Sequence, residues 1–264
     1  MIINSKRVNY RLSGSGIPVV LLHGYLESLE IWNGFGTKLS QTFKVLMIDL
    51  PGHGNSASLG DINRMEDMAF MINALTEKLG IDKLFLIGHS FGGYVTLAFL
   101  ELFPEKLLGF SLFHSHPFAD SPETIEKRNH EIELIKQGKK ELICQVNIPN
   151  SFANENLKKF EVEIDKAIQI AVKTSNEGII ATLGGMMQRH DRSLLLKKTK
   201  MPFLWILGEK DNYIPYQEIT EKVSMPLHAS LVTLRNSGHQ GFLEEEKQSL
   251  NVVGVFVQKY FPNS

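Results

Sequence analysis

The chain has 264 residues, of which 43% are hydrophobic and 22% are charged. These fractions are typical of globular proteins and exclude a disordered or collagen-like chain. The 28 basic and 29 acidic residues give a formal net charge of −1, so the composition has no electrostatic signature of nucleic-acid or anionic-membrane binding. The single cysteine, Cys144, cannot form an intrachain disulfide, which fits a reducing compartment.

At about 150 residues per domain, this length corresponds to one large domain with an insertion or to two small domains. Residues 1–7 lack the apolar run of a signal peptide, and no stretch approaches the ~18 consecutive apolar residues of a membrane span. We therefore expect a cytoplasmic protein with neither a membrane partner nor a nucleic-acid partner.

Short apolar runs that resemble strands alternate with helical patterns. Residues 8–12 alternate between apolar and polar side chains, which predicts an antiparallel edge strand. Later runs are continuous, as expected for parallel strands buried on both faces. They are residues 19–22, 44–48, 83–87, 107–113, 203–207 and 231–234. This alternation predicts an α/β fold with a mostly parallel, doubly wound sheet.

Helical spacing of apolar residues predicts a helix over 65–79 and another over 91–103, which ends before Pro104. The region 115–192 contains several helical patterns and no convincing strand. Its first helix is predicted to begin at Ser121-Pro122, with serine as the N-cap and proline in the first turn. We expect 115–192 to be a helical cap inserted into an α/β core formed by 1–114 and 193–264.

The sharpest local signal is Gly88-His89-Ser90-Phe91-Gly92, between an expected strand and an expected helix. A serine on such a turn is held in a strained backbone conformation with its hydroxyl exposed, as nucleophilic serines are. The pattern alone is weak, and an ordinary serine in a glycine-rich turn remains the alternative.

A serine nucleophile needs a base that a third group orients. Asp211 and His239 each follow a later expected strand, where parallel α/β sheets place their ligands. Asp211 could instead cap the next helix, with Glu209 as the acid, and His239 could be an ordinary loop histidine. The other expected position for the acid, after 107–113, has no carboxylate before Asp120, which favours Asp211.

The segment His23-Gly24-Tyr25 follows the strand at 19–22, where this architecture supplies an oxyanion-hole donor. We therefore predict that the backbone N–H groups of Tyr25 and Phe91 form the oxyanion hole. His114-Ser115-His116 looks like part of a metal site but lacks further ligands at suitable spacing, so no metal is expected.

Together these segments resemble the α/β-hydrolase superfamily, in the branch of esterases, carbon–carbon bond hydrolases and cofactor-free haloperoxidases. The resemblance implies a sheet of the α/β-hydrolase type with a helical cap inserted after the sixth strand. It also implies Ser90 as nucleophile, His239 as base, Asp211 as orienting acid and no cofactor. Related dehalogenases and epoxide hydrolases have aspartate at the nucleophile position of this strand-to-helix turn, where this chain has Ser90. The matching segments are His23-Gly24-Tyr25, Asp49 to Ser56, Gly88 to Gly93, Gly208 to Asp211 and Ser237-Gly238-His239.

The expected function is hydrolysis of a small or medium carboxylic ester through an acyl-enzyme on Ser90. The alternatives are hydrolysis of a carbon–carbon bond or a thioester by the same residues, and a hydrolase-like ligand sensor that signals to a protein partner. The oligomeric state stays open. The residues expected to contact the small-molecule substrate are His23, His114, Phe118, Phe152, Met186 and Met187.

Overall fold

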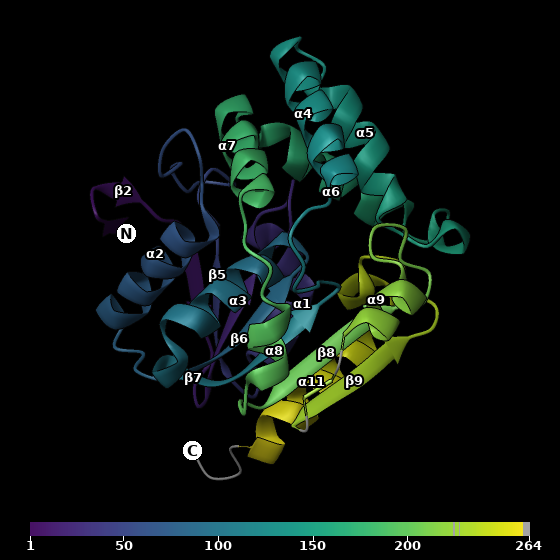
Figure 1. The fold of residues 1–264 in the computed structure, drawn as a ribbon. Coiled ribbons are helices and arrows are strands. Elements are labelled where there is room, and N and C mark those ends of the chain that lie inside the picture. Colours follow the sequence, from purple (N-terminus) through teal and green to yellow (C-terminus); the bar gives the residue numbers. More distant parts are fainter. Residues whose placement is uncertain (224, 227, 261–264) are drawn as a thin grey trace.

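A computed structural model describes residues 1–223, 225–226 and 228–260. A twisted sheet runs through its centre, with helices on both sides (Figure 1). The strands in the described residues are β1 (Ile2–Ile3), β2 (Lys6–Arg7), β3 (Tyr10–Ser13), β4 (Pro18–Leu22), β5 (Lys44–Ile48), β6 (Leu84–His89), β7 (Leu107–Phe113), β8 (Phe203–Gly208) and β9 (Ala229–Leu234).

Seven of these strands form the main sheet, in the order β3-β5-β4-β6-β7-β8-β9. β3 pairs antiparallel with β5 at one edge, and every other neighbouring pair is parallel. β6 and β8 are buried along their whole length. Continuous apolar runs form these central strands because helices cover both faces of the sheet. The predicted fold class is confirmed.

The helices α2 and α3 pack together on one face, and α1 and α11 pack together on the other (Figure 1). None of the described helices is long and apolar enough to cross a membrane. The helices are α1 (Asn33–Leu39), α2 (Met65–Lys78), α3 (Phe91–Leu102), α4 (Pro122–Lys136), α5 (Lys140–Asn150), α6 (Glu161–Lys173), α7 (Asn176–Met187), α8 (Ser193–Lys198), α9 (Tyr216–Lys222), α10 (Gly241–Glu244) and α11 (Glu246–Tyr260).

The insertion between β7 and β8 carries α4 to α8. Helices α4 to α7 stand together beyond one end of the sheet, whereas α8 lies beside it (Figure 1). The predicted start of α4 is confirmed, because Ser121 Oγ accepts the Thr124 N–H at 3.3 Å and Pro122 occupies the first turn. The division into a cap at 115–192 and a core formed by 1–114 and 193–264 stays a prediction. The last four residues of that core, 261–264, lie outside the described residues.

One detail of the expected topology is wrong: the insertion follows the fifth strand of the main sheet in chain order, not the sixth. The N-terminal segment supplies no additional strand to this sheet, because β1 and β2 pair with each other in a separate two-stranded sheet. Asn4 and Ser5 turn the chain between them with φ of 45° and 65°, a conformation that reverses the chain within two residues.

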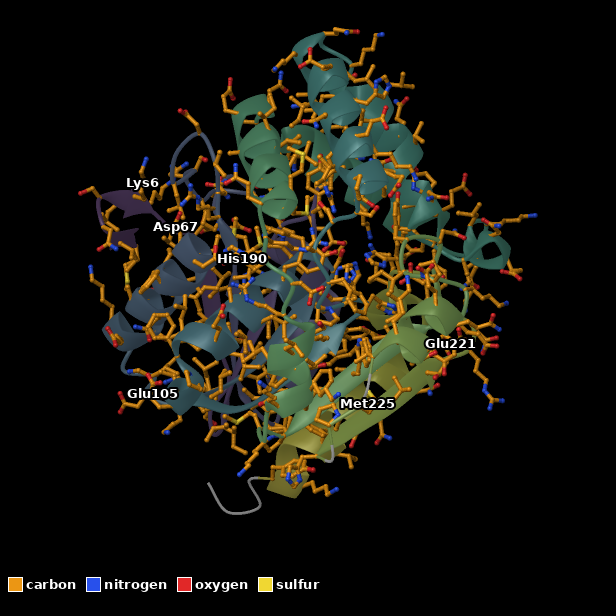
Figure 2. The ribbon with its side chains drawn as sticks, viewed as in Figure 1. Lys6, Asp67, Glu105, His190, Glu221 and Met225 are labelled. Atoms are coloured by element: carbon orange, nitrogen blue, oxygen red, sulfur yellow. The ribbon has the colours of Figure 1, made fainter. Side chains whose placement is uncertain are left out.

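Charged side chains such as Lys6, Glu105 and Glu221 point outward at the periphery of the molecule (Figure 2). The buried polar residues follow a different pattern, since many lie at or just after the ends of β4, β6, β7, β8 and β9. They include His23, Glu27, His89, His114, Asp211 and His239. Burying this many titratable groups side by side is costly unless they hydrogen-bond to one another.

Candidate active site

Ser90 lies between β6 and α3 with φ of 50° and ψ of −117°, a conformation that few non-glycine residues adopt. The neighbouring glycines permit the turn. A Cβ on Gly88 would lie 2.3 Å from the carbonyl oxygen of Gly92, and a Cβ on Gly92 would lie 2.6 Å from that of Leu22. The sequence expectation of a strained serine between strand and helix therefore matches the geometry.

Asp211 and His239 meet at the ends of β8 and β9. Asp211 Oδ2 lies 2.7 Å from His239 Nδ1, and its Oδ1 accepts the N–H groups of Tyr213 and Ile214 at 2.8 and 2.9 Å. Burial raises the pKa of Asp211, but the charge of His239 and hydrogen bonds from His114 and His239 outweigh it and hold that pKa well below its usual value. Asp211 is thus an ionised, fixed acceptor for the imidazole.

His114 lies at the other expected position for the acid, after β7, and supports Asp211. It is fully buried, and its Nδ1 lies 3.3 Å from Asp211 Oδ2. Its Nε2 accepts the Gly241 N–H at 3.1 Å. Burial lowers the pKa of His114 to about 4, so the ring is neutral at neutral pH.

Ser90 and His239 both line a cavity of about 750 Å³ between the strand ends and the inserted helices. Within the described residues, Ser90 Oγ has no hydrogen bond to His239. In ligand-free enzymes such a bond is often long and tightens only when substrate binds. The pairing of these two side chains stays a prediction.

Of the six residues expected to contact substrate, Phe118 and Met186 line the cavity. The other four, His23, His114, Phe152 and Met187, are not among the cavity-lining residues in the described structure, so nothing in its geometry supports their contact with substrate. His23 is fully buried with Nδ1 2.8 Å from the carbonyl oxygen of Gly24, and its Nε2 accepts the Leu50 N–H at 2.9 Å. It therefore braces the loop after β4.

Phe152 and His114 are also fully buried and pack inside the protein. The Phe152 ring lies 6.1 Å from that of Phe160. Met187 is the last residue of α7 and is partly exposed outside the cavity. Sequence periodicity assigned these side chains to the inserted region or to a strand end but carried no information on which way each one faces.

Neither predicted oxyanion donor has an acceptor among the described residues: the backbone N–H groups of Tyr25 and Phe91 are both free of internal hydrogen bonds. Phe91 is the first residue of α3, so the positive end of the helix dipole adds to its N–H. Both residues adjoin Ser90 or the cavity. Free N–H groups at such a place can stabilise an oxyanion, a role that stays a prediction.

A buried ion pair lies behind these groups. His89 Nδ1 is 3.1 Å from Glu27 Oε2, and its Nε2 is 2.8 Å from the carbonyl oxygen of His239. Both partners of the ring are acceptors, so the imidazole must carry both protons. Glu27 also accepts the Gly24 N–H at 2.6 Å and the Gln240 amide at 2.9 Å. The pair therefore joins the loop after β4 to the loop that carries His239.

The pKa values agree with a charged pair. Burial raises the pKa of Glu27, but His89 and the other donors outweigh it and lower the value to about 2. Burial lowers the pKa of His89, yet Glu27 outweighs it and the net shift is upward. Glu27 was not among the residues predicted from the sequence, where Ser28 and Glu30 beside it make it look like any other polar position in a loop.

His114, Asp211 and His239 bring three possible metal-ligand atoms within 4.8 Å of one another. The closest two, His239 Nδ1 and Asp211 Oδ2, are 2.7 Å apart. Two ligands about 2.0 Å from a tetrahedral zinc ion lie roughly 3.3 Å apart. The spacing therefore fits a hydrogen bond better than a shared cation.

Known proteins with a similar fold include characterised hydrolases. A model of the alpha/beta hydrolase fold matches residues 17–135. The structure of an esterase from Thermogutta terrifontis, solved with malate bound, superposes with a TM-score of 0.92 at 27% identity and covers 97% of this chain and 94% of its own. The chain therefore has the α/β-hydrolase fold.

Other known proteins resemble this chain over most of its length. The enol-lactonase of Burkholderia xenovorans LB400 has the same fold, with a TM-score of 0.87 at 21% identity and coverage of 97% and 98% of the two chains. The 2-succinyl-6-hydroxy-2,4-cyclohexadiene-1-carboxylate synthase of Enterobacter sp. is 24% identical, with 92% of each chain matched. An acetyltransferase component of the acetoin cleaving system of Pseudomonas putida is 26% identical, but the match spans 66% of its length.

Proposed function

We propose that this protein is a serine hydrolase that cleaves carboxylic esters through an acyl-enzyme on Ser90. The observation that carries the proposal is the meeting of a strained serine and a carboxylate-bound histidine at one cavity. Ser90 and His239 both line it, and His239 Nδ1 lies 2.7 Å from the buried carboxylate of Asp211. The similarity to the Thermogutta esterase supports the same reaction class.

In the proposed reaction His239 Nε2 takes the Ser90 proton as Oγ attacks the acyl carbonyl. The Tyr25 and Phe91 N–H groups hold the oxyanion, and His239 then returns the proton to the leaving alcohol. A water molecule repeats these steps and releases the acid. Asp211 keeps Nδ1 protonated, so that Nε2 is free to accept the proton, and stabilises the imidazolium.

A fluorophosphonate probe and a series of nitrophenyl esters of graded acyl length test this proposal. The probe should label Ser90, and Ser90→Ala should abolish both labelling and turnover, whereas Ser40→Ala, on the surface after α1, should change neither. Wild-type turnover by Ser90→Ala would refute the mechanism.

The acid is tested separately. Asp211→Asn removes the charge that fixes the His239 tautomer and should lower kcat by about 10⁴, as in serine proteases. Glu209→Gln changes the exposed neighbouring carboxylate and should have less than about a twofold effect. Steady-state kinetics on a short nitrophenyl ester measures both, and the opposite result would give the role of the acid to Glu209.

One relative favours a second candidate reaction. A 2-hydroxy-6-oxononadienedioate hydrolase of Pseudomonas putida is 26% identical over 247 residues and covers 88% of this chain. Cleavage of a carbon–carbon bond next to a ketone would use the same serine and histidine. If Ser90 is labelled but no ester is turned over, assays with vinylogous 1,5-diketones come next, and the absence of any turnover favours ligand sensing.

A further inference from the structure

The helix α4 presents an arginine to the catalytic cavity. Arg128 lines the cavity together with Ser90 and His239. Its Nε donates to Asp120 Oδ2 at 2.6 Å, and its Nη2 donates to Asp120 Oδ1 at 3.3 Å. These two bonds hold the guanidinium in a fixed orientation on the wall.

A second arginine shares the same carboxylate. Arg189 Nη1 lies 2.7 Å from Asp120 Oδ1, its Nε donates to the carbonyl oxygen of Phe118, and its guanidinium stacks 3.9 Å from the centre of the Tyr94 ring. Arg189 is buried, so its charge is satisfied inside the protein. Two guanidiniums and one carboxylate leave this trio with one excess positive charge.

The remaining charged groups at the cavity do not remove that excess. Glu218 and Lys222 form an ion pair with each other. Glu131 and Lys127 contribute one negative and one positive charge to the cavity lining, so their charges cancel. Glu131 makes no ion pair with Arg128 within 4.0 Å in the described structure.

A carboxyl group and an imidazole complete the wall near the arginine. Glu131 uses Oε1 to accept the Tyr25 hydroxyl at 2.9 Å and the Asn147 amide at 3.3 Å, and burial raises its pKa. His116 is neutral at pH 7, because burial lowers its pKa to about 3. Among the described residues, Arg128 therefore shares its one ion-pair partner, Asp120, with Arg189.

The third nitrogen of Arg128 is free. Nη1 has no hydrogen-bond partner in the part of the chain that the structure describes, and it is not among the fully buried unpartnered atoms. A guanidinium stays protonated at any physiological pH, and a half-buried one gains much from an anionic partner. Nη1 therefore offers a charged donor to whatever occupies the cavity.

We propose that Arg128 binds a carboxylate of the substrate, so that the preferred substrates are esters that carry a second, free carboxylate. Half-esters of short dicarboxylic acids have this chemistry. Hydrolysis consumes one water, breaks the acyl C–O bond and yields an alcohol and a dicarboxylate. This inference rests on the proposed function, since it places the anion in the same cavity as Ser90.

Kinetics on matched substrates tests the preference. We expect wild-type kcat/KM for monoethyl glutarate to exceed that for diethyl glutarate, measured in a pH-stat. In Arg128→Gln the ratio of the two values should fall about tenfold or more, mainly through KM, as expected for losing one charged hydrogen bond. The ratio is independent of any general loss of active protein. Lys136→Gln, which makes the same charge change on the exposed face of α4, should leave the ratio unchanged.

A binding measurement separates this inference from the proposed function. Calorimetry of glutarate with Ser90→Ala needs no turnover, and adding Arg128→Gln should weaken binding about tenfold or more. Equal glutarate affinity with and without Arg128→Gln, or equal wild-type kcat/KM for half-ester and diester, would overturn the inference and leave the serine hydrolase standing. Failure of the probe to label Ser90 would instead refute the proposed function.

Discussion

The ion pair of Glu27 and His89 shows how single residues behind the cavity support the reacting ones. His89 is the residue before Ser90, and it donates to the backbone of His239, 150 positions later. Glu27 accepts the Gly24 N–H beside the predicted oxyanion donor. Removing one partner of such a buried ion pair lowers the free energy of unfolding by about 3–5 kcal/mol, because the other charge is left uncompensated.

The effect of pH on this pair follows from the two pKa shifts. The pKa of Glu27 falls from an ordinary 4.5 to about 2, so its stabilisation is complete above pH 4.5 and is lost as the pH falls toward 2. The pKa of His89 is raised from 6.5, so its stabilisation is complete below pH 6.5 and is lost as the pH rises through the folded-state pKa. The pair therefore stabilises most between pH 4.5 and 6.5.

We predict that Glu27→Gln lowers the free energy of unfolding by about 3 kcal/mol in that window and by much less below pH 3. Urea unfolding of wild type and variant at a series of pH values measures the difference. Glu105→Gln, an exposed carboxylate at the periphery (Figure 2), should show no such dependence. A Glu27→Gln deficit that did not change with pH would mean that the pair is not ionised.

At the scale of elements, the turn from β6 to α3 depends on backbone approach. A Cβ atom on Gly88 would lie 2.3 Å from the carbonyl oxygen of Gly92 and 2.3 Å from the hydroxyl oxygen of Thr96. The close contact lets α3 pack directly against the sheet and sets the position of Ser90. The strain of the serine is maintained by the packing of both elements.

Gly88→Ala should therefore destabilise the protein by several kcal/mol, on the order of an overpacked core, and reduce Ser90 labelling. Gly254→Ala is the matched control, because a Cβ in the middle of α11 meets nothing within 4 Å. It should stabilise by about 0.5–1 kcal/mol through helix propensity. Thermal unfolding compares the two, and similar shifts in Tm would contradict the steric argument.

At the scale of the whole molecule, Glu244 joins the inserted helices to the catalytic loop. From α10 it accepts the N–H groups of Ala153 and Gly238 at 2.9 and 2.8 Å, and the Asn156 amide at 2.7 Å. Ala153 and Asn156 belong to the insertion, whereas Gly238 precedes His239. One carboxylate thus sets the distance between the two parts at the cavity.

Glu244→Gln replaces one acceptor oxygen by an amide that cannot accept the N–H groups now facing it. We predict a loss of about 1–3 kcal/mol in stability and a fall in kcat larger than the change in KM, because His239 is displaced while the cavity wall remains. Glu246→Gln, two residues later and partly exposed, is the control. A variant with unchanged kcat would show that the loop is held by other contacts.

The sequence by itself determined the α/β class, nearly every strand, the turn at Ser90 and the candidates Asp211 and His239. These features leave local signals, because apolar periodicity, glycines at a tight turn and residues after strand ends are read within a few positions. The tertiary structure alone decided that His23, His114 and Phe152 face inward, and that Glu27 meets His89 across 62 positions. It also decided that Asp120, Arg128 and Arg189 form one cluster at the cavity. The direction of a side chain and its distant partners depend on how whole helices and strands pack, which no local pattern encodes.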